Sequence, residues 1–303
     1  MKLKKAIITG ATGFIGRHLT KMVEHPIVVG RSLKKLQKIF PKAECVEWHP
    51  PDLIPKELFE GVEVVFHLAG ENIYKGRWNE KKKKRILESR QIATRTIVDS
   101  MCLAKKRPKA FISSSAVGFY GDCGVDTITE EFGPGTDFLS EVCQVWELEA
   151  LRATSCGVRV VVVRTGIVLD AKGGALAEML KLFKLGLGGK LGKGSQYMPW
   201  IHIDDLISIM AYCAENEKVS GPVNAVAPNP VTNQEFTKIL AKTIKRPAFI
   251  PVPAPVLKLM VGEFADALLA SQKVMPQKLL RLGYQFKYPE LSKALENLLE
   301  RNS

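Results

Sequence analysis

The chain has 303 residues, of which 46% are hydrophobic, and carries a formal net charge of +13 at pH 7. This composition excludes a disordered chain and allows one large domain or about two of ordinary size. The lysines are spread over many segments and accompany no recognised nucleic-acid-binding module. We therefore interpret the charge as attraction for small anionic ligands and expect no nucleic-acid partner.

The cysteine spacing and the lengths of the apolar runs indicate in which cellular compartment the protein is found. The six cysteines show no CxxC spacing, which argues against a disulfide framework and a zinc site and favours a reducing compartment. No apolar run approaches the ~20 residues that a membrane-spanning helix needs. The N-terminus leads directly into an expected strand without a separate signal segment. We therefore expect a soluble cytoplasmic protein with no metal and no membrane partner.

The sequence GATGFIG at residues 10–16 follows an apolar run at residues 6–8. We predict a buried strand that stops at a glycine turn and leads into a helix from Phe14. Gly10 permits the turn, Gly13 lets the backbone approach a pyrophosphate, and Gly16 lets the helix pack against the strand. This order favours dinucleotide binding over a plain packing turn. The predicted cofactor contacts here are Gly10, Thr12, Gly13, Phe14, Ile15 and Gly16.

A short second strand is predicted at residues 27–29 and ends at Gly30, Arg31 and Ser32. An acidic side chain at this position would bind the ribose 2′-hydroxyl of NAD, whereas Arg31 can pair with a 2′-phosphate. We therefore predict NADP, in its reduced form NADPH, as the cofactor. The alternative is an ordinary exposed arginine at a strand end. Ser32 is placed to cap the helix expected at residues 33–39.

Further strands and helices are predicted to alternate along the chain. The expected strands are 45–48, 62–68, 110–112, 158–164 and 222–225, and the expected helices are 80–106, a segment containing 143–151, 175–185 and 233–245. Residues 117–136 are expected to form a loop. The glycine-rich stretch after residue 185 is a candidate lid, and the segment from Trp200 is expected to lead from a strand into a helix capped by an aspartate.

This alternation over the first 170 residues predicts an α/β fold with a Rossmann-type doubly wound parallel sheet. We assign residues 1–175, with 200–228 returning, to an NADP-binding Rossmann domain. Residues 176–199 and 229–303 are assigned to a smaller mixed C-terminal substrate lobe. Ligands collect at the carboxyl ends of the strands of such a sheet. The residues expected there are Leu68, Ala69 and Gly70 as cofactor contacts and Glu71 as a substrate contact.

Five segments together resemble the extended short-chain dehydrogenase/reductase superfamily: GATGFIG, HLAG at 67–70, SSSAVGFYGD from Ser113, RTGIVL from Arg164 and WIHIDD from Trp200. The chain more closely resembles the atypical YfcH-like epimerase-family proteins through SR at 89–90, CQVWE at 143–147, GLGG at 186–189 and the segment 246–265. The resemblance implies an NADP-binding Rossmann domain with a small C-terminal domain, a cofactor contact at Arg164, and a monomer or homodimer. It also implies a small-molecule substrate, a nucleotide sugar or another hydroxylated or carbonyl compound.

Ordinary members of this superfamily use a serine together with the tyrosine and lysine of a YxxxK motif to move a substrate proton. Ser115 is the candidate for the serine, but no YxxxK occurs anywhere in the chain. The expected helix offers Cys143 and, four residues later on the same face, Glu147. Because a carboxylate beside a thiol disfavours the thiolate, the usual proton relay is not expected.

Two functional hypotheses remain. One is an enzyme of the reductase or epimerase type, and the other is a non-catalytic NADP(H)-dependent regulator or redox sensor. Cys143 and Glu147 can also simply pack a helix. The glycine lid and the polar residues of the C-terminal part favour the enzyme. Its candidate catalytic residues are Ser115, Tyr120, Cys143 and Glu147, and its candidate substrate contacts are Glu71, Gln196, Trp200 and His202.

Overall fold

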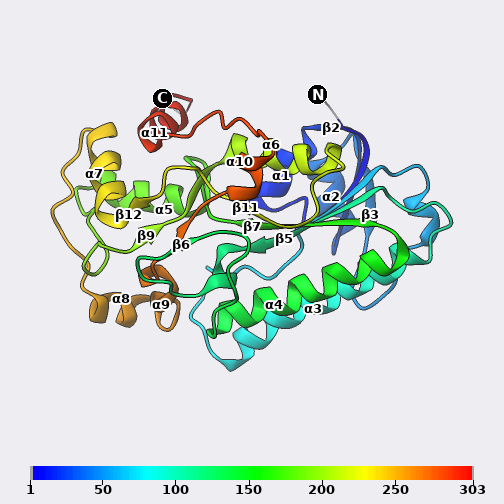
Figure 1. Cartoon of the computed structure of the whole chain (residues 1–303), viewed down its shortest axis with the longest axis horizontal. Helices are drawn as coiled ribbons and strands as arrows, with labels where there is room; N and C mark the ends of the chain where they lie inside the picture. The colour runs from blue at the N-terminus through cyan, green and yellow to red at the C-terminus, as the bar shows by residue number, and fades with distance from the viewer. Residues whose placement is uncertain (1–2, 75, 302–303) are drawn as a thin grey trace.

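The computed structural model describes residues 3–74 and 76–301 and contains one large parallel sheet (Figure 1). Its seven strands lie in the order β11-β7-β5-β4-β1-β2-β3, and each neighbouring pair is parallel. These strands are β1 (Leu3–Thr9), β2 (Val23–Gly30), β3 (Glu44–Glu47), β4 (Val64–His67), β5 (Ala110–Ala116), β7 (Arg159–Thr165) and β11 (Gly221–Ala225). The strand order reverses between β1 and β4, so the predicted doubly wound fold is confirmed. Ligands bind at such a switch point, beyond the carboxyl ends of the strands.

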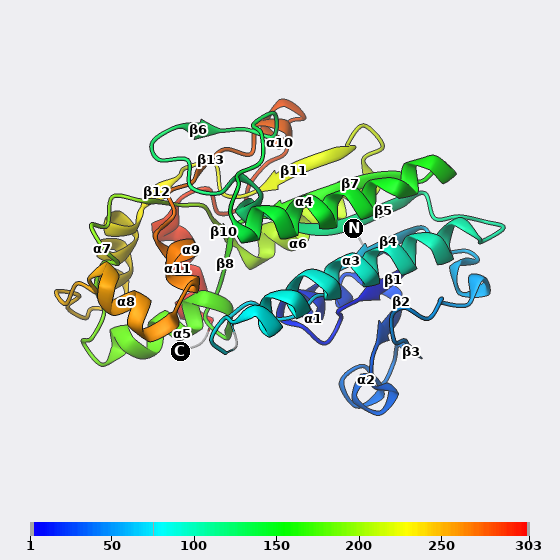
Figure 2. The same cartoon turned by 90° about the horizontal axis from the view of Figure 1, so that it is seen from below.

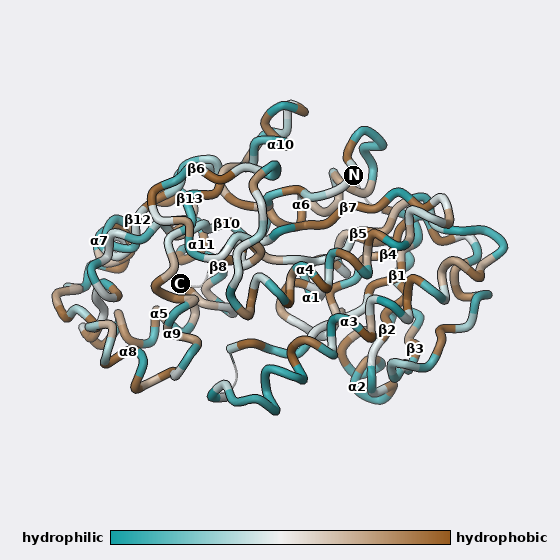
Figure 3. Tube along the Cα trace, turned by 60° about the horizontal axis from the view of Figure 1, so that its bottom comes forward, coloured by the Kyte–Doolittle hydropathy of each residue, from teal (hydrophilic) through white to brown (hydrophobic). Residues whose placement is uncertain are grey.

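Helices cover both faces of this sheet. Packed on one face are α1 (Phe14–Thr20), α2 (Leu33–Ile39) and α6 (Ile203–Glu215), and on the other are α3 (Glu80–Cys102) and α4 (Phe138–Leu151). Neighbouring residues of β1 divide between the two cores: Ile8 shares a cluster with Leu206, and Ile7 shares another with Ile97. Figure 2 shows α3 and α4 side by side, and in Figure 3 hydrophobic colouring follows central strands such as β7.

Several of the smaller elements, among them α7 (Asn233–Thr243), α8 (Ala254–Val261) and α9 (Phe264–Leu269), gather at one end of the sheet (Figure 1). The other small helices are α5 (Gly174–Lys184), α10 (Gln277–Arg281) and α11 (Leu291–Glu300). The strand pairs are β8 (Ile167–Asp170) with β10 (Trp200–His202), β9 (Tyr197–Met198) with β12 (Val231–Thr232), and β6 (Thr127–Ile128) with β13 (Lys273–Val274). The 3₁₀ helices are η1 (Lys56–Phe59), η2 (Val117–Tyr120) and η3 (Arg152–Cys156). No helix within the described ranges combines the length and hydrophobicity that a bilayer crossing requires.

The predicted elements are present, with shifted boundaries. Strand β5 continues to Ala116, so the serines 113–115 lie inside the strand rather than after it. The expected loop at residues 117–136 contains η2 and β6. His202, not an aspartate, caps α6 by accepting a hydrogen bond from the Asp204 amide. Strand β11 pairs with β7 in the main sheet, as expected for residues 222–225, while the division into domains remains a prediction.

The cysteine spacing argued against a disulfide framework, but one pair of cysteines is joined. Cys102 at the end of α3 and Cys156 at the end of η3 form a disulfide, with Cα atoms 5.6 Å apart. The two residues are 54 positions apart in sequence. No local spacing reveals their proximity, because it arises when α3 and the segment after α4 pack on the same face of the sheet.

Candidate functional site

The glycine turn lies directly against the end of β4. Gly10 has φ +67°, and a Cβ built there would lie 2.6 Å from the carbonyl oxygen of Leu68. A Cβ on Gly16 would lie 2.5 Å from the carbonyl oxygen of Gly10. Only glycine fits at both positions. The sequence therefore brings the first turn of α1 to the point where the strand order reverses.

The N-terminus of α1 is open to an anion. Gly13 is the N-cap of this helix, is exposed, and supplies no capping side chain. The amides at the start of a helix lack intrahelical partners and carry the positive end of the helix dipole. They suit a pyrophosphate, as predicted from the motif. Thr12 and Ile15 are half-buried beside Gly13, and the ring of Phe14 packs against Gly173 at the start of α5.

Arg31 lies beside this turn. Arg31 directly follows β2. The pairing of β1 with β2 ends at Thr9 and Val29, so Gly10 and Arg31 lie at the same edge of the sheet. The Arg31 side chain is exposed to solvent. Ser32 caps α2 by accepting a hydrogen bond from the Lys35 amide at 3.4 Å, as predicted. The cation is therefore exposed at the end of β2, and its contact with a 2′-phosphate stays a prediction.

The segment after β4 is held by three side chains of α3. Lys82 Nζ donates to Glu71 Oε1 at 2.7 Å, Ser89 Oγ accepts from the Glu71 amide at 2.9 Å, and Arg90 donates to the Glu71 carbonyl at 3.2 Å. The hydrogen bond from Lys82 lowers the pKa of Glu71. A Cβ on Gly70 would lie 3.1 Å from the Arg90 guanidinium carbon. Sequence reasoning recorded Ser89 and Arg90 only as part of a family motif and missed their position beside the site.

Three predicted residues meet in a buried polar network at the carboxyl end of β5. Ser115 Oγ donates to Glu147 Oε1 at 2.7 Å. Arg164 binds the same carboxylate at two points, from Nε to Oε1 at 2.9 Å and from Nη2 to Oε2 at 2.8 Å. Ser115 and Arg164 come together because they are register partners on β5 and β7, and Glu147 reaches them from α4. A serine, a carboxylate and a guanidinium thus form one continuous unit.

Tyr120 extends this network towards β11. Its hydroxyl donates to Asn224 Oδ1 at 2.7 Å and accepts a hydrogen bond from Arg164 Nη1 at 3.0 Å. The Arg164 guanidinium also lies over the Phe119 ring, 3.5 Å from its centroid. Burial raises the pKa of Tyr120, and Arg164 opposes this effect only in part. The phenol is therefore neutral at physiological pH. Asn224 was missed because it lies 104 residues from Tyr120 in sequence.

Cys143 lies one helical turn before Glu147 on α4 and is buried. Burial, followed by the nearby Glu147 carboxylate, raises the pKa of the Cys143 thiol to about 11, although Arg90 opposes the shift. The sequence argument that Glu147 disfavours a thiolate agrees with this direction. A protonated thiol is a weak nucleophile. Covalent chemistry at Cys143 is not supported by this environment.

The other predicted substrate residues have internal partners. Gln196 Nε2 donates to the Leu191 carbonyl at 3.1 Å, and Trp200 Nε1 donates to the Asn229 carbonyl at 3.3 Å. The His202 ring caps α6, and burial lowers its pKa to about 4. It also stacks on Tyr288 with centroids 3.9 Å apart. In the described part of the chain, no recorded hydrogen bond joins these three residues directly to Ser115, so their substrate role stays a prediction.

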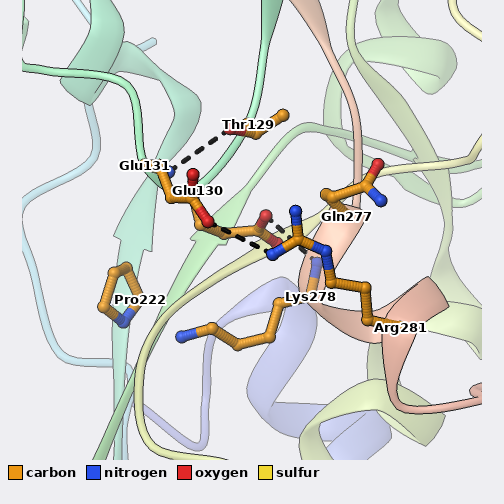
Figure 4. Close-up of a pocket in the computed structure, with 7 residues that line it drawn as sticks. All are labelled: Thr129, Glu130, Glu131, Pro222, Gln277, Lys278 and Arg281. Carbon is orange, nitrogen blue, oxygen red and sulfur yellow. Dashed lines mark hydrogen bonds and ion pairs between the residues drawn. The ribbon is translucent and has the colours of Figure 1, made fainter.

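The far end of the network reaches a cavity of about 300 Å³ beside β11 (Figure 4). Glu130 accepts hydrogen bonds from the amides of Asn224 and Lys278, each at 3.1 Å. Arg281 pairs with Glu131 at 3.2 Å, and Figure 4 shows its guanidinium pointing towards both glutamates. The charged side chains of this cavity are therefore largely used to join α10 to the edge of the sheet. Within the described ranges, no group of three or more metal-ligating side chains gathers at any site.

The profile of the NAD dependent epimerase/dehydratase family matches residues 6–226, and a domain of unknown function matches residues 252–298. The chain belongs to the NAD dependent epimerase/dehydratase family. The expected resemblance to epimerase-family proteins is confirmed, and with it a place among the atypical short-chain dehydrogenase/reductase proteins.

Several epimerase-family relatives match nearly end to end. The chain is 39% identical to the chloroplastic SDR39U1 homolog of Arabidopsis thaliana, over 97% of this chain and 86% of that protein. It is 36% identical to YfhF of Bacillus subtilis, over 96% and 97% of the two chains. The crystal structure of human SDR39U1 with NADPH has a TM-score of 0.86 at 35% identity and covers 98% of this chain and 99% of the human one. A UDP-glucuronic acid 4-epimerase from Bacillus cereus, 17% identical with a TM-score of 0.75 over 99% of this chain and 100% of that one, shares the fold.

Proposed function

We propose that this epimerase-family protein binds NADPH and transfers hydride between its nicotinamide and a small hydroxylated or carbonyl compound. The observation that carries the proposal is the glycine turn, in which any side chain on Gly10 or Gly16 would collide with backbone. Such a turn leaves the amides of α1 open to a pyrophosphate. The NADPH bound by the human relative, at 35% identity, supports the same cofactor here.

Different residues of the chain are proposed to bind different parts of the cofactor. We propose that the predicted residues of the turn bind the pyrophosphate mainly through their backbone, and that Arg31 binds the 2′-phosphate. The backbone of Leu68, Ala69 and Gly70 borders the cofactor from the end of β4. Arg164 was also predicted as a cofactor contact. Because its guanidinium already serves Glu147 and Tyr120, we propose that its role is to support that network.

The substrate would lie between the carboxyl end of β5 and the C-terminal elements. The bound nicotinamide would exchange a hydride with the substrate, and the protein must then hold the substrate oxygen and move one proton. Ser115 is the proposed contact to that oxygen, with Glu147 behind it. Tyr120 and Cys143 remain neutral at physiological pH and border the site. We propose a nucleotide sugar or a related hydroxylated compound as substrate, with Glu71, Gln196, Trp200 and His202 as proposed contacts.

A second function is an NADP(H)-dependent regulator without catalysis. The specific observation in its favour is the absence of YxxxK from the whole sequence. The enzyme is favoured because Ser115, Glu147 and Arg164 form a continuous hydrogen-bonded network at the carboxyl end of β5. We further propose a cytoplasmic location, a monomer or homodimer, and a Rossmann domain of residues 1–175 and 200–228 with a C-terminal substrate lobe.

Calorimetric titration with NADPH and NADH tests the cofactor assignment. Wild-type protein is expected to bind NADPH more tightly, and Arg31→Ala to lose this preference, since a charge-assisted pair contributes about 1.5–3 kcal/mol. Lys34→Ala removes an exposed cation three residues away and is the matched control. Equal affinity of Arg31→Ala and wild type for NADPH would refute the 2′-phosphate assignment. Tight NADPH binding without hydride transfer to any nucleotide sugar, ketone or quinone would favour the regulator.

A further inference from the structure

We propose that Ser115 and Glu147, held by Arg164, form the proton path that replaces a tyrosine–lysine pair, and that the resting site therefore accepts the hydroxyl form of its substrate. This inference rests on the proposed NADP(H) binding. It goes further by naming the functional group that the site accepts and the route of its proton.

The direction of the first hydrogen bond decides the functional group. A serine hydroxyl has one proton, and Ser115 donates it to Glu147 Oε1 at 2.7 Å. What remains on Ser115 Oγ is acceptor capacity only. A ketone oxygen also only accepts, whereas an alcohol can donate to Oγ. The resting network is therefore complementary to the hydroxyl form of a substrate.

Arg164 fixes this direction. Its Nε–H and Nη2–H donate to the two different oxygens of Glu147, so both oxygens accept and the paired guanidinium favours the carboxylate form. A carboxylate has no proton to return to Ser115. Side chains of Glu147 and Arg164 are 8% and 5% exposed, so water does not compete for these contacts.

The other polar groups beside Ser115 cannot take the same part. The Cys143 thiol, which shares a side-chain hydrogen bond with Ser115, stays protonated because burial raises its pKa to about 11. The Tyr120 hydroxyl donates its proton in a hydrogen bond to Asn224 Oδ1, and its oxygen accepts from Arg164. Arg164 itself has no acceptor atom and does not lose its proton in proteins. Of this unit, Ser115 alone combines a proton already directed inward with an oxygen at the carboxyl end of β5.

The proposed step balances in atoms and charge. The substrate carbon loses a hydride to NADP⁺ while its hydroxyl proton passes to Ser115 Oγ. The Ser115 proton passes in the same step to Glu147 Oε1. The products are a carbonyl compound, NADPH and a neutral Glu147 carboxyl, which afterwards returns its proton through Ser115 to solvent. Ser115 contacts the substrate, Glu147 is the base that receives the proton through Ser115, and Arg164 is the positioning residue behind them.

Isotope-edited infrared spectroscopy tests the path without a known substrate. In NADPH-bound protein labelled with ¹³C-carboxyl glutamate, the Glu147 band is the one that disappears in Glu147→Gln. Ser115→Ala is expected to shift this band, Ser115→Thr to restore it, and Ser114→Ala, the matched control, to leave it in place. An unshifted band in Ser115→Ala overturns the proposal. Where Glu147→Gln does not fold, Glu147→Asp identifies the band, because the unlabelled aspartate removes it from the ¹³C-shifted set.

Hydride transfer provides the second readout. NADP⁺-loaded protein is mixed with UDP-glucose, UDP-glucuronic acid and cyclohexanol, and NADPH formation is followed by fluorescence. Ser115→Ala and Glu147→Gln are expected to slow oxidation at least ~100-fold, with NADPH affinity unchanged and Ser115→Thr active. Oxidation by Glu147→Gln at the wild-type rate overturns the path. Failure of wild type to bind NADPH overturns the proposed function itself, whereas NADPH binding with an unshifted infrared band overturns only the proton path.

Discussion

Arg164 on β7 and Glu147 on α4 face each other through two parallel hydrogen bonds, at 2.9 and 2.8 Å, in the protein interior. Both side chains are at least nine-tenths buried. A buried ion pair contributes little net stability, but removing one partner leaves a buried charge without compensation. This relationship makes the pair sensitive to single substitutions and tolerant of paired ones.

Glu147→Ala is therefore expected to lower the free energy of unfolding by about 3–5 kcal/mol. Replacing both residues by methionine should recover much of this loss. The control is Glu131→Ala, which breaks an exposed pair with Arg281 and should cost no more than about 1 kcal/mol. Denaturant unfolding monitored by circular dichroism measures each value. Equal effects for Glu147→Ala and Glu131→Ala would contradict the buried-pair account.

Gly10→Ala should destabilise the protein through both an unfavourable positive φ and a steric clash. A substitution at Gly61, which has a positive φ without a clash, separates the two effects. Gly10 and Gly61 both have positive φ, but a Cβ on Gly61 meets nothing within 4 Å, whereas one on Gly10 meets the Leu68 carbonyl at 2.6 Å. Gly61→Ala should cost about 1–2 kcal/mol from the backbone conformation alone. Gly10→Ala should cost more and also abolish NADPH binding. Chemical denaturation and calorimetric titration check the two effects, and similar behaviour of both variants would show that the close approach is unimportant.

The disulfide between Cys102 and Cys156 closes a loop of 54 residues. On the chain-entropy estimate, such a cross-link stabilises the folded protein by about 4 kcal/mol. Cys102→Ser should therefore lower the denaturation midpoint, and a reducing agent should lower that of wild type but not of the variant. Cys45→Ser, at a free cysteine, is the control. Alkylation and mass spectrometry under non-reducing conditions report the bond directly, and two free thiols at these positions in oxidised protein would contradict it.

Two buried histidines make stability depend on pH. Burial lowers the pKa of His67 from 6.5 to about 3 and that of His202 to about 4. As pH falls below about 6.5, these histidines become protonated in the unfolded chain but stay neutral in the folded one. The free energy of unfolding therefore decreases as pH drops from about 6.5 towards the folded pKa values. Between about 6.5 and 4.5 the carboxylates contribute little. His67→Gln should flatten the slope of unfolding free energy against pH, and exposed His49→Gln should leave it unchanged; equal slopes for wild type and His67→Gln would contradict the assignment.

The sequence was informative wherever the signal is local. An apolar run before GATGFIG predicted β1, the turn and α1, because one short segment contains both the hydrophobic pattern and the glycines that the close approach to β4 requires. The Ser32 cap was found in the same way. Four-residue spacing also placed Cys143 and Glu147 on one helix face.

Long-range partners were not predictable from spacing. Asn224 joins the network only because β11 returns to pair with β7. The pairing of Cys102 with Cys156 likewise depends on how two segments pack on the sheet. The stacking of the His202 ring on Tyr288 of the C-terminal part was also not predictable, while its substrate role stays a prediction. A polar residue in a motif does not reveal whether its partner is a ligand or a distant segment of the same chain.

A crystal structure of the protein with NADPH tests the central claim most directly. The account predicts the pyrophosphate on the amides that follow Gly13, the 2′-phosphate paired with Arg31, and the nicotinamide at the carboxyl end of β5 beside Ser115. Glu147 should keep both hydrogen bonds to Arg164. A cofactor bound elsewhere, or a nicotinamide turned away from Ser115 with Arg31 unengaged, would contradict it.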